Sequence, residues 1–522
     1  MISQQYPALL IIAPLLGAFV VAVLSWVDKK YCFGMAVASL AAATVSSILL
    51  LIDVVAQAPE PIVYKLGGWD PPFGISYYVD SLNALVLAVI SCVTLVNLGT
   101  VRTAVNKEHP GKEGSFYALY LLAVTGHLGM VVTGDAFNLY VLLEIAALSG
   151  YALLGMGHRR AAFSTLNYLF MGTIGASFYL LGVGYLYIQT GSLNMVDIAG
   201  ILTQTGATMT VLTAMSLIFI GVLIKMALFP MHAWLPNAYT HASSPASSLI
   251  APMTTKVMVY VLIRMMLTVF TPDITFSMPP VTETMVWLAS AAIVGCALLA
   301  LSARNLKRML TYILIAEVGY MVGGAWLGNT TGMTGAVLHI VNDAAMTLVM
   351  FLAAACMAYR LKSLDFDDLK GAFSKMPFTM AFFVLGAVAM IGVPPTCGFF
   401  SKWYLLLGGV QAGNAGMFGG YVFCGSLILS SLINVVLFFR VFEIAHFEPL
   451  AQGVDDHGHP IRPKIPMEEA PPTLVGGLAL TAVALVVLGL FTSDIVDVIE
   501  AGVLPLLDPS LTDTIFLAVT GS

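Results

Sequence analysis

Charged residues are scarce in this chain of 522 residues. Asp, Glu, Lys and Arg make up 10% of it, whereas 59% of the residues are hydrophobic. Soluble globular proteins carry about 25% charged residues, so this composition excludes an ordinary soluble domain. The net charge of −6 provides no basic surface for nucleic acid. The chain is therefore predicted to be a multi-pass membrane protein that binds no nucleic acid.

Signals for a metal or a cofactor are also missing. All six cysteines fall in apolar stretches and no two form a Cys-x-x-Cys pair, so neither a disulfide framework nor a zinc site is expected. No nucleotide motif is present, so any redox chemistry would belong to a partner. The loop 446–470 contains histidines and aspartates, but no helix holds them in place, and it is predicted to be solvated. We expect no cofactor and no metal.

What the chain has in abundance is long apolar runs. A membrane span needs about 20 apolar residues, and fourteen stretches approach or exceed that length. No basic region precedes the first run, so it is expected to be a span and not a cleaved signal. The tail 493–522 holds no full span and is expected to lie along the membrane surface or against a partner. The predicted spans are 7–26, 32–52, 80–100, 115–133, 136–157, 162–188, 209–230, 246–270, 284–303, 307–327, 332–358, 378–406, 419–444 and 472–492.

The basic residues support this count. If the loop after the first span is cytoplasmic and the sides alternate, 17 of the 22 lysines and arginines lie in cytoplasmic loops and only Lys65 lies outside. Fourteen spans then leave both termini outside. The outer loop 60–78 carries aromatic and β-branched residues around Gly67-Gly68 and Pro71-Pro72, a composition that predicts a short hairpin.

Two spans contain their own breaks. The seventh ends in the run from Lys225 to Pro230, and the twelfth contains Gly392-Val-Pro394-Pro395 before Lys402. Proline removes a backbone donor, and lipid tolerates such a break only where protein or a wet cavity satisfies the freed groups. Broken helices at corresponding places in two halves are typical of inverted-repeat transporters. We predict an all-α polytopic fold with two inverted five-helix repeats, spans 4–8 and 9–13, and broken helices 7 and 12.

This interpretation divides the chain into four parts. A three-helix segment with the outer hairpin comes first, followed by the two five-helix repeats, and a cytoplasmic loop with the last helix and the tail ends the chain. The predicted boundaries are 1–114, 115–270, 271–445 and 446–522.

Four charged residues at membrane depth are the first candidates for function. Glu144 lies near the middle of the fifth span, where a charge costs roughly 2.5–3.5 kcal/mol on insertion scales. Lys225, Lys256 and Lys402 lie at similar depth in later spans. One buried acid and three buried bases suggest a path for protons or cations. The structural alternatives are a neutral, hydrogen-bonded Glu144 and a Lys225 that snorkels to the nearby surface.

Further polar residues could extend this path. His232 and His241, in the loop after Pro230, could admit protons from the cytoplasm, or could be structural. His339 shares one helix face with Asn342 and Asp343, because the spacing is i, i+3 and i+4.

Glu317, in the tenth span, is another candidate for a proton relay. Buried carboxylates, lysines and histidines can each pass between charged and neutral forms when their neighbours change.

Four motifs carry a resemblance to a known family. They are GDAFNLYVLLEI around Glu144, KMALFPMHAWLPNAYTHASSPASSLI from Lys225, LKRMLTYILIAEVGY at 306–320 and GVPPTCGFFSKW ending near Lys402. Through them the chain resembles the antiporter-like subunits shared by respiratory complex I, membrane-bound hydrogenases and Mrp-type cation/proton antiporters. It is most similar to the D-type subunit of Mrp antiporters and its hydrogenase-associated relatives, over nearly the whole chain.

The resemblance implies roles for these residues. Glu144 and Lys225 would form a charge pair, Lys256 would be the central relay, and His339 would lead to Lys402 at the outward exit. The protein would be the proton-translocating subunit of a multi-subunit sodium/proton antiporter, an ion transporter and not an enzyme by itself. It would lie in a bacterial or archaeal cytoplasmic membrane with other membrane subunits.

Two other functions remain open. One is that of a proton-pumping membrane component driven by a distant redox arm, as in complex I or a membrane-bound hydrogenase. The other is that of a scaffold protein that transports nothing. A lysine at 402, where one type of complex I subunit carries glutamate, argues against that type.

The chain departs from the family pattern in the second half of the relay. The family's eleventh span commonly reads His-x-x-Asn-His-Ala-x-x-Lys, whereas this chain has Asp343 in place of the second histidine and Thr347 in place of the lysine. The usual glutamine before Gly-Tyr in the tenth span is Glu317. We therefore expect carboxylates to take part in this half of the relay.

Overall fold

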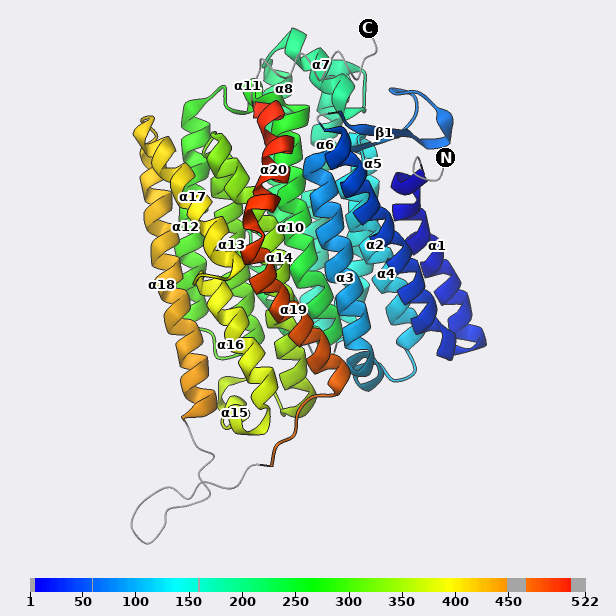
Figure 1. The fold of residues 1–522 in the computed structure, drawn as a ribbon. Helices are drawn as coiled ribbons and strands as arrows, with labels where there is room; N and C mark the ends of the chain where they lie inside the picture. Colours follow the sequence, from blue (N-terminus) through cyan, green and yellow to red (C-terminus); the bar gives the residue numbers. More distant parts are fainter. Residues whose placement is uncertain (1–4, 59, 158–159, 448–465, 508–522) are drawn as a thin grey trace.

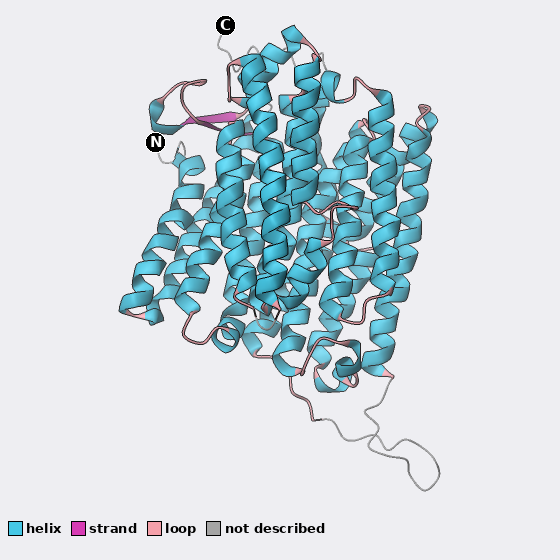
Figure 2. Ribbon diagram, turned by 180° about the vertical axis from the view of Figure 1, so that it is seen from behind, coloured by secondary structure: helices cyan, strands magenta, loops and turns pink. Residues whose placement is uncertain are grey.

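The structure, a computed structural model, describes residues 5–58, 60–157, 160–447 and 466–507. Long helices run side by side in one bundle, with a short β-hairpin at one end (Figures 1 and 2). Twelve of the described helices are long and apolar enough to cross a membrane. The predicted all-α polytopic fold is thereby confirmed.

The twelve long helices share high hydropathy and at least 19 residues each. They are α1 (Tyr6–Val27), α2 (Cys32–Gln57), α3 (Ser81–Glu108), α4 (Glu113–Val132), α5 (Ala136–Gly155), α6 (Ala161–Thr190), α10 (Ser244–Arg264), α12 (Pro279–Leu301), α13 (Leu306–Trp326), α14 (Thr330–Arg360), α18 (Phe418–His446) and α19 (Pro472–Leu490). The shorter helices are α7 (Met195–Thr205), α8 (Met209–Lys225), α9 (Trp234–His241), α11 (Thr271–Thr275), α15 (Ala372–Lys375), α16 (Pro377–Ile391), α17 (Cys397–Asn414) and α20 (Thr492–Leu507).

The two remaining predicted spans are the two with breaks. Helix α8 ends at Lys225, where Ala227 takes a positive φ of 59°, and the chain resumes as α9 after Pro230. Helix α16 ends before Gly392, whose φ of 92° suits glycine, and α17 begins after Pro394-Pro395. Both predicted breaks therefore exist. The inverted-repeat relation and the four-part division stay predictions.

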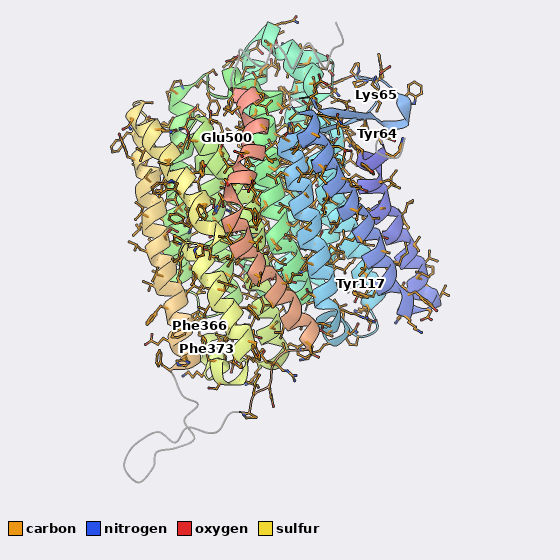
Figure 3. All side chains as sticks on the ribbon, viewed as in Figure 1. Tyr64, Lys65, Tyr117, Phe366, Phe373 and Glu500 are labelled. Carbon is orange, nitrogen blue, oxygen red and sulfur yellow. The ribbon has the colours of Figure 1, made fainter. Side chains whose placement is uncertain are left out.

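The outer loop forms the predicted hairpin. Strands β1 (Ile62–Lys65) and β2 (Ser76–Val79) pair antiparallel, with Ile62 opposite Val79. Figure 3 shows Lys65 on this hairpin at one end of the bundle, and Phe366 and Phe373 at the other end. The described residues of the loops predicted to be cytoplasmic gather at that second end (Figure 1).

The first part of the tail differs from expectation. The tail 493–522 was expected to lie along the membrane surface or against a partner. Instead, residues up to Leu507 form α20, which continues upward from α19 and packs against α3 and α14 (Figure 1). The reason is its amphipathic pattern, which buries Ile499 and Val503 within the chain itself. Residues 508–522, and 448–465 of the loop predicted to be solvated, lie outside the described residues.

Three helices form the centre of the bundle. In α10, α13 and α14 every residue of the apolar stretch is buried, whereas less than half of the apolar stretch of α1 is buried. Asparagine side chains begin two of these helices: Asn305 accepts from the amide of Arg308, and Asn329 accepts from that of Gly332. Polar residues in these stretches are therefore shielded from the surface of the chain by other protein groups.

Candidate functional site

The first ion pair lies at the edge of this centre. Lys225 Nζ, at the end of α8, is 3.4 Å from Glu144 Oε1 on α5. Lys225 is buried, but the Glu144 side chain keeps 24% of its surface exposed. The pair that the resemblance implied is thus in contact, and the snorkelling alternative for Lys225 does not describe this conformation. The contact is long for a charged hydrogen bond, which usually measures about 2.7–2.9 Å.

A small cavity adjoins Lys225. Its volume is about 20 Å³, enough for one water molecule. Lys225, His127 and Tyr168 line it, and Thr254 lines it from α10. We call Lys225 and Glu144 the edge pair. The cavity therefore extends from this pair to α10, which carries Lys256 two residues beyond Thr254.

The second ion pair lies at the centre. Lys256 Nζ on α10 is 2.9 Å from Asp343 Oδ2 on α14, and both side chains are wholly inaccessible to solvent. Lys256 also donates to Thr347 Oγ1 at 3.1 Å and to the carbonyl of Ala251 at 3.4 Å. Thr347 in turn donates to Asp343 Oδ1 at 2.7 Å. Lysine, threonine and aspartate thus form a closed triangle, in which the ammonium has two hydrogen-bond acceptors and one ion-pair partner.

Asp343 and Thr347 form contacts with Lys256 that the sequence did not predict. The sequence marks both as departures from the family pattern, but it assigns a partner to neither. Their i, i+4 spacing on one helix was the available signal. What could not be read was that Lys256 faces them, because α10 and α14 meet only in the folded bundle.

Glu317 lies on α13 beside this triangle. Its side chain is fully buried, and it interacts with Asp343, Lys402 and Lys256. Neither of its carboxyl oxygens receives a hydrogen bond from the described residues.

His339 is one turn before Asp343 on α14. Its Nδ1 is 2.9 Å from Ser401 Oγ on α17, and its ring lies 5.4 Å from that of Tyr320. Asn342, on the same predicted polar face, donates to the carbonyl of Cys397 at 2.8 Å. These contacts join α14 to the second half of the broken helix, which carries Lys402.

Lys402 is the last of the candidate residues along the chain. Its side-chain nitrogen donates to the carbonyls of Met390, at 2.6 Å, and Ile391, at 3.2 Å, at the end of α16. The break frees these carbonyls, and a lysine suits the negative end of a helix dipole. Gly392 leaves room for this side chain, since a Cβ there would lie 3.0 Å from Lys402 Cδ. A cavity of about 290 Å³, lined by Lys402, Trp403 and Ser431 among others, opens beside it.

The two candidate histidines stand apart from Lys256, and His241, predicted to lie in the loop after Pro230, is instead the last residue of α9. His232 stacks on Phe229 at 5.1 Å and lies near Tyr312, and His241 Nδ1 is 3.0 Å from Ser164 Oγ. Within the described residues, no hydrogen bond or ion pair joins either histidine to Lys256. Their role as proton acceptors from the cytoplasm stays a prediction.

A third buried ion pair, Arg264 with Asp80, connects two helices. Arg264, near the end of α10, holds Asp80 through two hydrogen bonds of 2.6 and 2.8 Å and also donates to Tyr260. Asp80 caps α3 through Asn83. This bidentate contact joins α10 to the start of α3 next to the hairpin. We therefore place it outside the predicted path for protons or cations.

Comparison with known proteins identifies relatives. Residues 133–428, more than half of the chain, match the family described as NADH:quinone oxidoreductase/Mrp antiporter, TM. The chain is 38% identical over 505 residues to a protein named as the N subunit of NADH-quinone oxidoreductase from Desulforudis audaxviator, covering 96% of this chain and 99% of that one. It is 31% identical to a putative antiporter protein, mnhD2, of Staphylococcus aureus over 77% of this chain and 78% of that one. Similarity to the D subunit of the Na(+)/H(+) antiporter of Alkalihalophilus pseudofirmus is 29% identity, over 78% of this chain and 81% of that one.

Solved structures share the fold. A chain of the membrane-bound sulfane sulfur reductase, an archaeal respiratory membrane complex, superposes with a TM-score of 0.86 at 27% identity, over 99% of this chain and all of that one. A chain of the Mrp complex from Dietzia gives the same TM-score at 21% identity and the same coverage. Both likenesses extend over nearly the whole bundle.

Proposed function

Since the chain belongs to the NADH:quinone oxidoreductase/Mrp antiporter transmembrane family, a family of ion-transporting membrane subunits, we propose that it is the proton-translocating subunit of a multi-subunit sodium/proton antiporter. The observation that carries the proposal is the buried charge row, by which we mean Glu144, Lys225, Lys256, Asp343, Glu317 and Lys402. It runs through the bundle by way of the wholly buried central helices. A cavity adjoins the row at Lys225 and another at Lys402.

The row supports a stepwise path. A proton taken up near His232 and His241 reaches Lys256 and passes along the Asp343 side of the centre, beside His339, to Lys402 and outward. The edge pair acts as a switch. When Glu144 and Lys225 are in contact, their charges compensate; when they separate, the lone Lys225 cation repels a proton on Lys256. At about 4 Å and an effective dielectric near 20, such a pair is worth about 4 kcal/mol, enough to move a proton between sites.

The setting follows from the relatives. Proteins with this fold occur in multi-subunit membrane complexes, so we propose membrane subunits as partners and a prokaryotic cytoplasmic membrane as the location. The loops rich in basic residues would face the cytoplasm and both termini would lie outside. The inverted five-helix repeats, α4–α10 and α12–α18, would place the broken helices α8 and α16–α17 at equivalent positions.

Replacing Glu144 with Gln tests the function. The complex is reconstituted in vesicles, and sodium-driven proton movement is followed with a pH-sensitive dye. We expect E144Q to abolish transport while the subunits still copurify, because the amide cannot hold the charge that the switch needs. Full activity of this variant would contradict the switch. If Lys256→Ala and Lys402→Ala also left ion flux unchanged, the scaffold alternative would hold.

A redox-driven pump is the second candidate. The observation in its favour is the 38% identity, over nearly the full length, to the relative named as the N subunit of an NADH-quinone oxidoreductase. The same buried charge row would serve it. Isolation of the native complex separates the two: iron–sulfur proteins that copurify would support the pump, and small membrane proteins alone would support the antiporter.

A further inference from the structure

Glu317 is a buried carboxyl group to which no described residue donates a hydrogen bond. It lies within the wholly buried part of α13, and neither Oε1 nor Oε2 receives a hydrogen bond from the described residues. An ionised carboxylate that is buried without hydrogen-bond donors is strongly destabilised. A carboxyl group in such a place is stabilised when it carries its own proton and gives it to a neighbouring acceptor.

Asp343 is the neighbour that offers an acceptor. Helix α13 packs against α14, and the ring of Tyr320, one turn beyond Glu317, lies 5.4 Å from that of His339, one turn before Asp343. The two carboxyl groups therefore lie at the same level of these helices and interact with each other. Asp343 Oδ1 already accepts from Thr347. Oδ2 lies 2.9 Å from the Lys256 ammonium but receives no well-directed hydrogen bond from the described residues. Because an ionised carboxylate is only an acceptor, two carboxyl groups can bond to each other only through a proton.

The charges around Glu317 and Asp343 also indicate that the two carboxyl groups hold one proton between them. The ammonium of Lys256 compensates Asp343 directly, since the two groups are in contact. The side-chain nitrogen of Lys402 is held instead by two backbone carbonyls and by Ser431 Oγ at 3.4 Å. A second negative charge beside Asp343 would therefore face a like charge with no cation in contact. Two carboxyl groups that share one buried site hold one proton between them.

We propose that Glu317 and Asp343 form an acid pair that shares a single proton, donated by Glu317 to Asp343 Oδ2, and that this pair stores the proton that passes from Lys256 to Lys402. The inference rests on the proposed proton translocation for its role, but the shared proton can be measured without transport. It makes Asp343 a site residue that the family pattern, with histidine there, would not predict.

The transfer step balances. Before it, Lys256 and Glu317 are protonated, Asp343 is ionised and Lys402 is a neutral amine. Lys256 gives a proton to Asp343 while Glu317 gives its own to Lys402. Afterwards Lys256 is neutral, the acid pair still holds one proton, now on Asp343, and Lys402 is cationic. That proton then returns to Glu317 across the shared hydrogen bond, which resets the pair while Lys402 releases its proton outward.

Infrared spectroscopy of the purified complex in lipid films tests the shared proton. A protonated carboxyl group has a carbonyl stretch separate from that of a carboxylate, and this stretch shifts in D₂O. We expect the native protein to show such a band and Glu317→Gln to lose it. The amide of E317Q still donates to Asp343, so the fold is preserved, and the family carries glutamine there. Glu283→Gln is the matched control, because Glu283, near the start of α12, accepts from the amide of Gly419; it keeps the band.

Vesicle transport tests the role. We expect E317Q to lower proton flux at least tenfold, while E283Q keeps the native rate. Identical carboxyl bands in native protein and E317Q would overturn the acid pair. A lost band with undiminished flux would overturn its role in the relay. A band lost in E317Q, together with no ion-coupled flux in the native complex, would support the acid pair and refute the proposed function instead.

Discussion

Two lysine–carboxylate pairs lie in the buried charge row, and they differ in the distance between the charges, in solvent exposure and in the groups beside them. The edge pair, Lys225 with Glu144, spans 3.4 Å, keeps a quarter of the acid exposed and adjoins a cavity for one water. The central pair, Lys256 with Asp343, spans 2.9 Å without any exposed surface and is bridged by Thr347. The two charged groups of the edge pair can therefore separate, whereas those of the central pair are held in contact.

The helices explain this difference. Lys225 is the last residue of α8, and the chain beyond it is irregular up to α9. A side chain at such a helix end can follow small movements of the loop. Lys256 and Asp343 lie in the interior of two continuous helices that pack against each other. We infer that conformational change is confined to the edge, and that protons alone move at the centre.

The largest expected effect is on removal of the central acid. Asp343→Ala leaves the Lys256 ammonium buried without its counter-ion, which costs about 3–5 kcal/mol of folding free energy. We expect a large drop in stability, measured by thermal unfolding in detergent. A double variant, Asp343→Ala with Lys256→Met, should recover most of the loss, because the uncompensated charge is gone. An equally unstable double variant would show that the pair is not the cause.

A smaller effect is expected when only the bridge is removed. Thr347→Val keeps the shape but deletes the hydroxyl that accepts from Lys256 and donates to Asp343. Hydrogen bonds to charged groups are worth about 1.5–3 kcal/mol, so the stability should fall by about that amount. Thr347→Ser, which keeps the hydroxyl, is the control. If both variants were equally stable, the central pair would not depend on the bridge, and its contrast with the edge pair would weaken.

Much of this arrangement was predictable from sequence, and the reason is the membrane. Lipid forces backbone polar groups to pair within helices, so apolar runs, loop lysines and the proline breaks at Pro230 and Pro394 were enough to locate the spans. Contacts between spans were not predictable in this way. Asp343 was visible as an unusual residue, but its pairing with Lys256 depends on how α10 rotates against α14. The first part of the tail was misplaced for the same reason, since the apolar face of α20 finds its partner within the chain.

The smallest expected effect on stability is at the edge pair. Partly exposed ion pairs contribute about 0.2–1 kcal/mol, so Glu144→Gln should change the unfolding free energy by less than about 1 kcal/mol. The cavity beside Lys225 provides room for a water that can take over as its acceptor. A double-mutant cycle with Lys225→Met, measured by the same thermal unfolding, should give a coupling several times smaller than the cycle at the centre. Coupling as large as that of Lys256 with Asp343 would mean that the edge pair is also locked, and that it cannot be the switch.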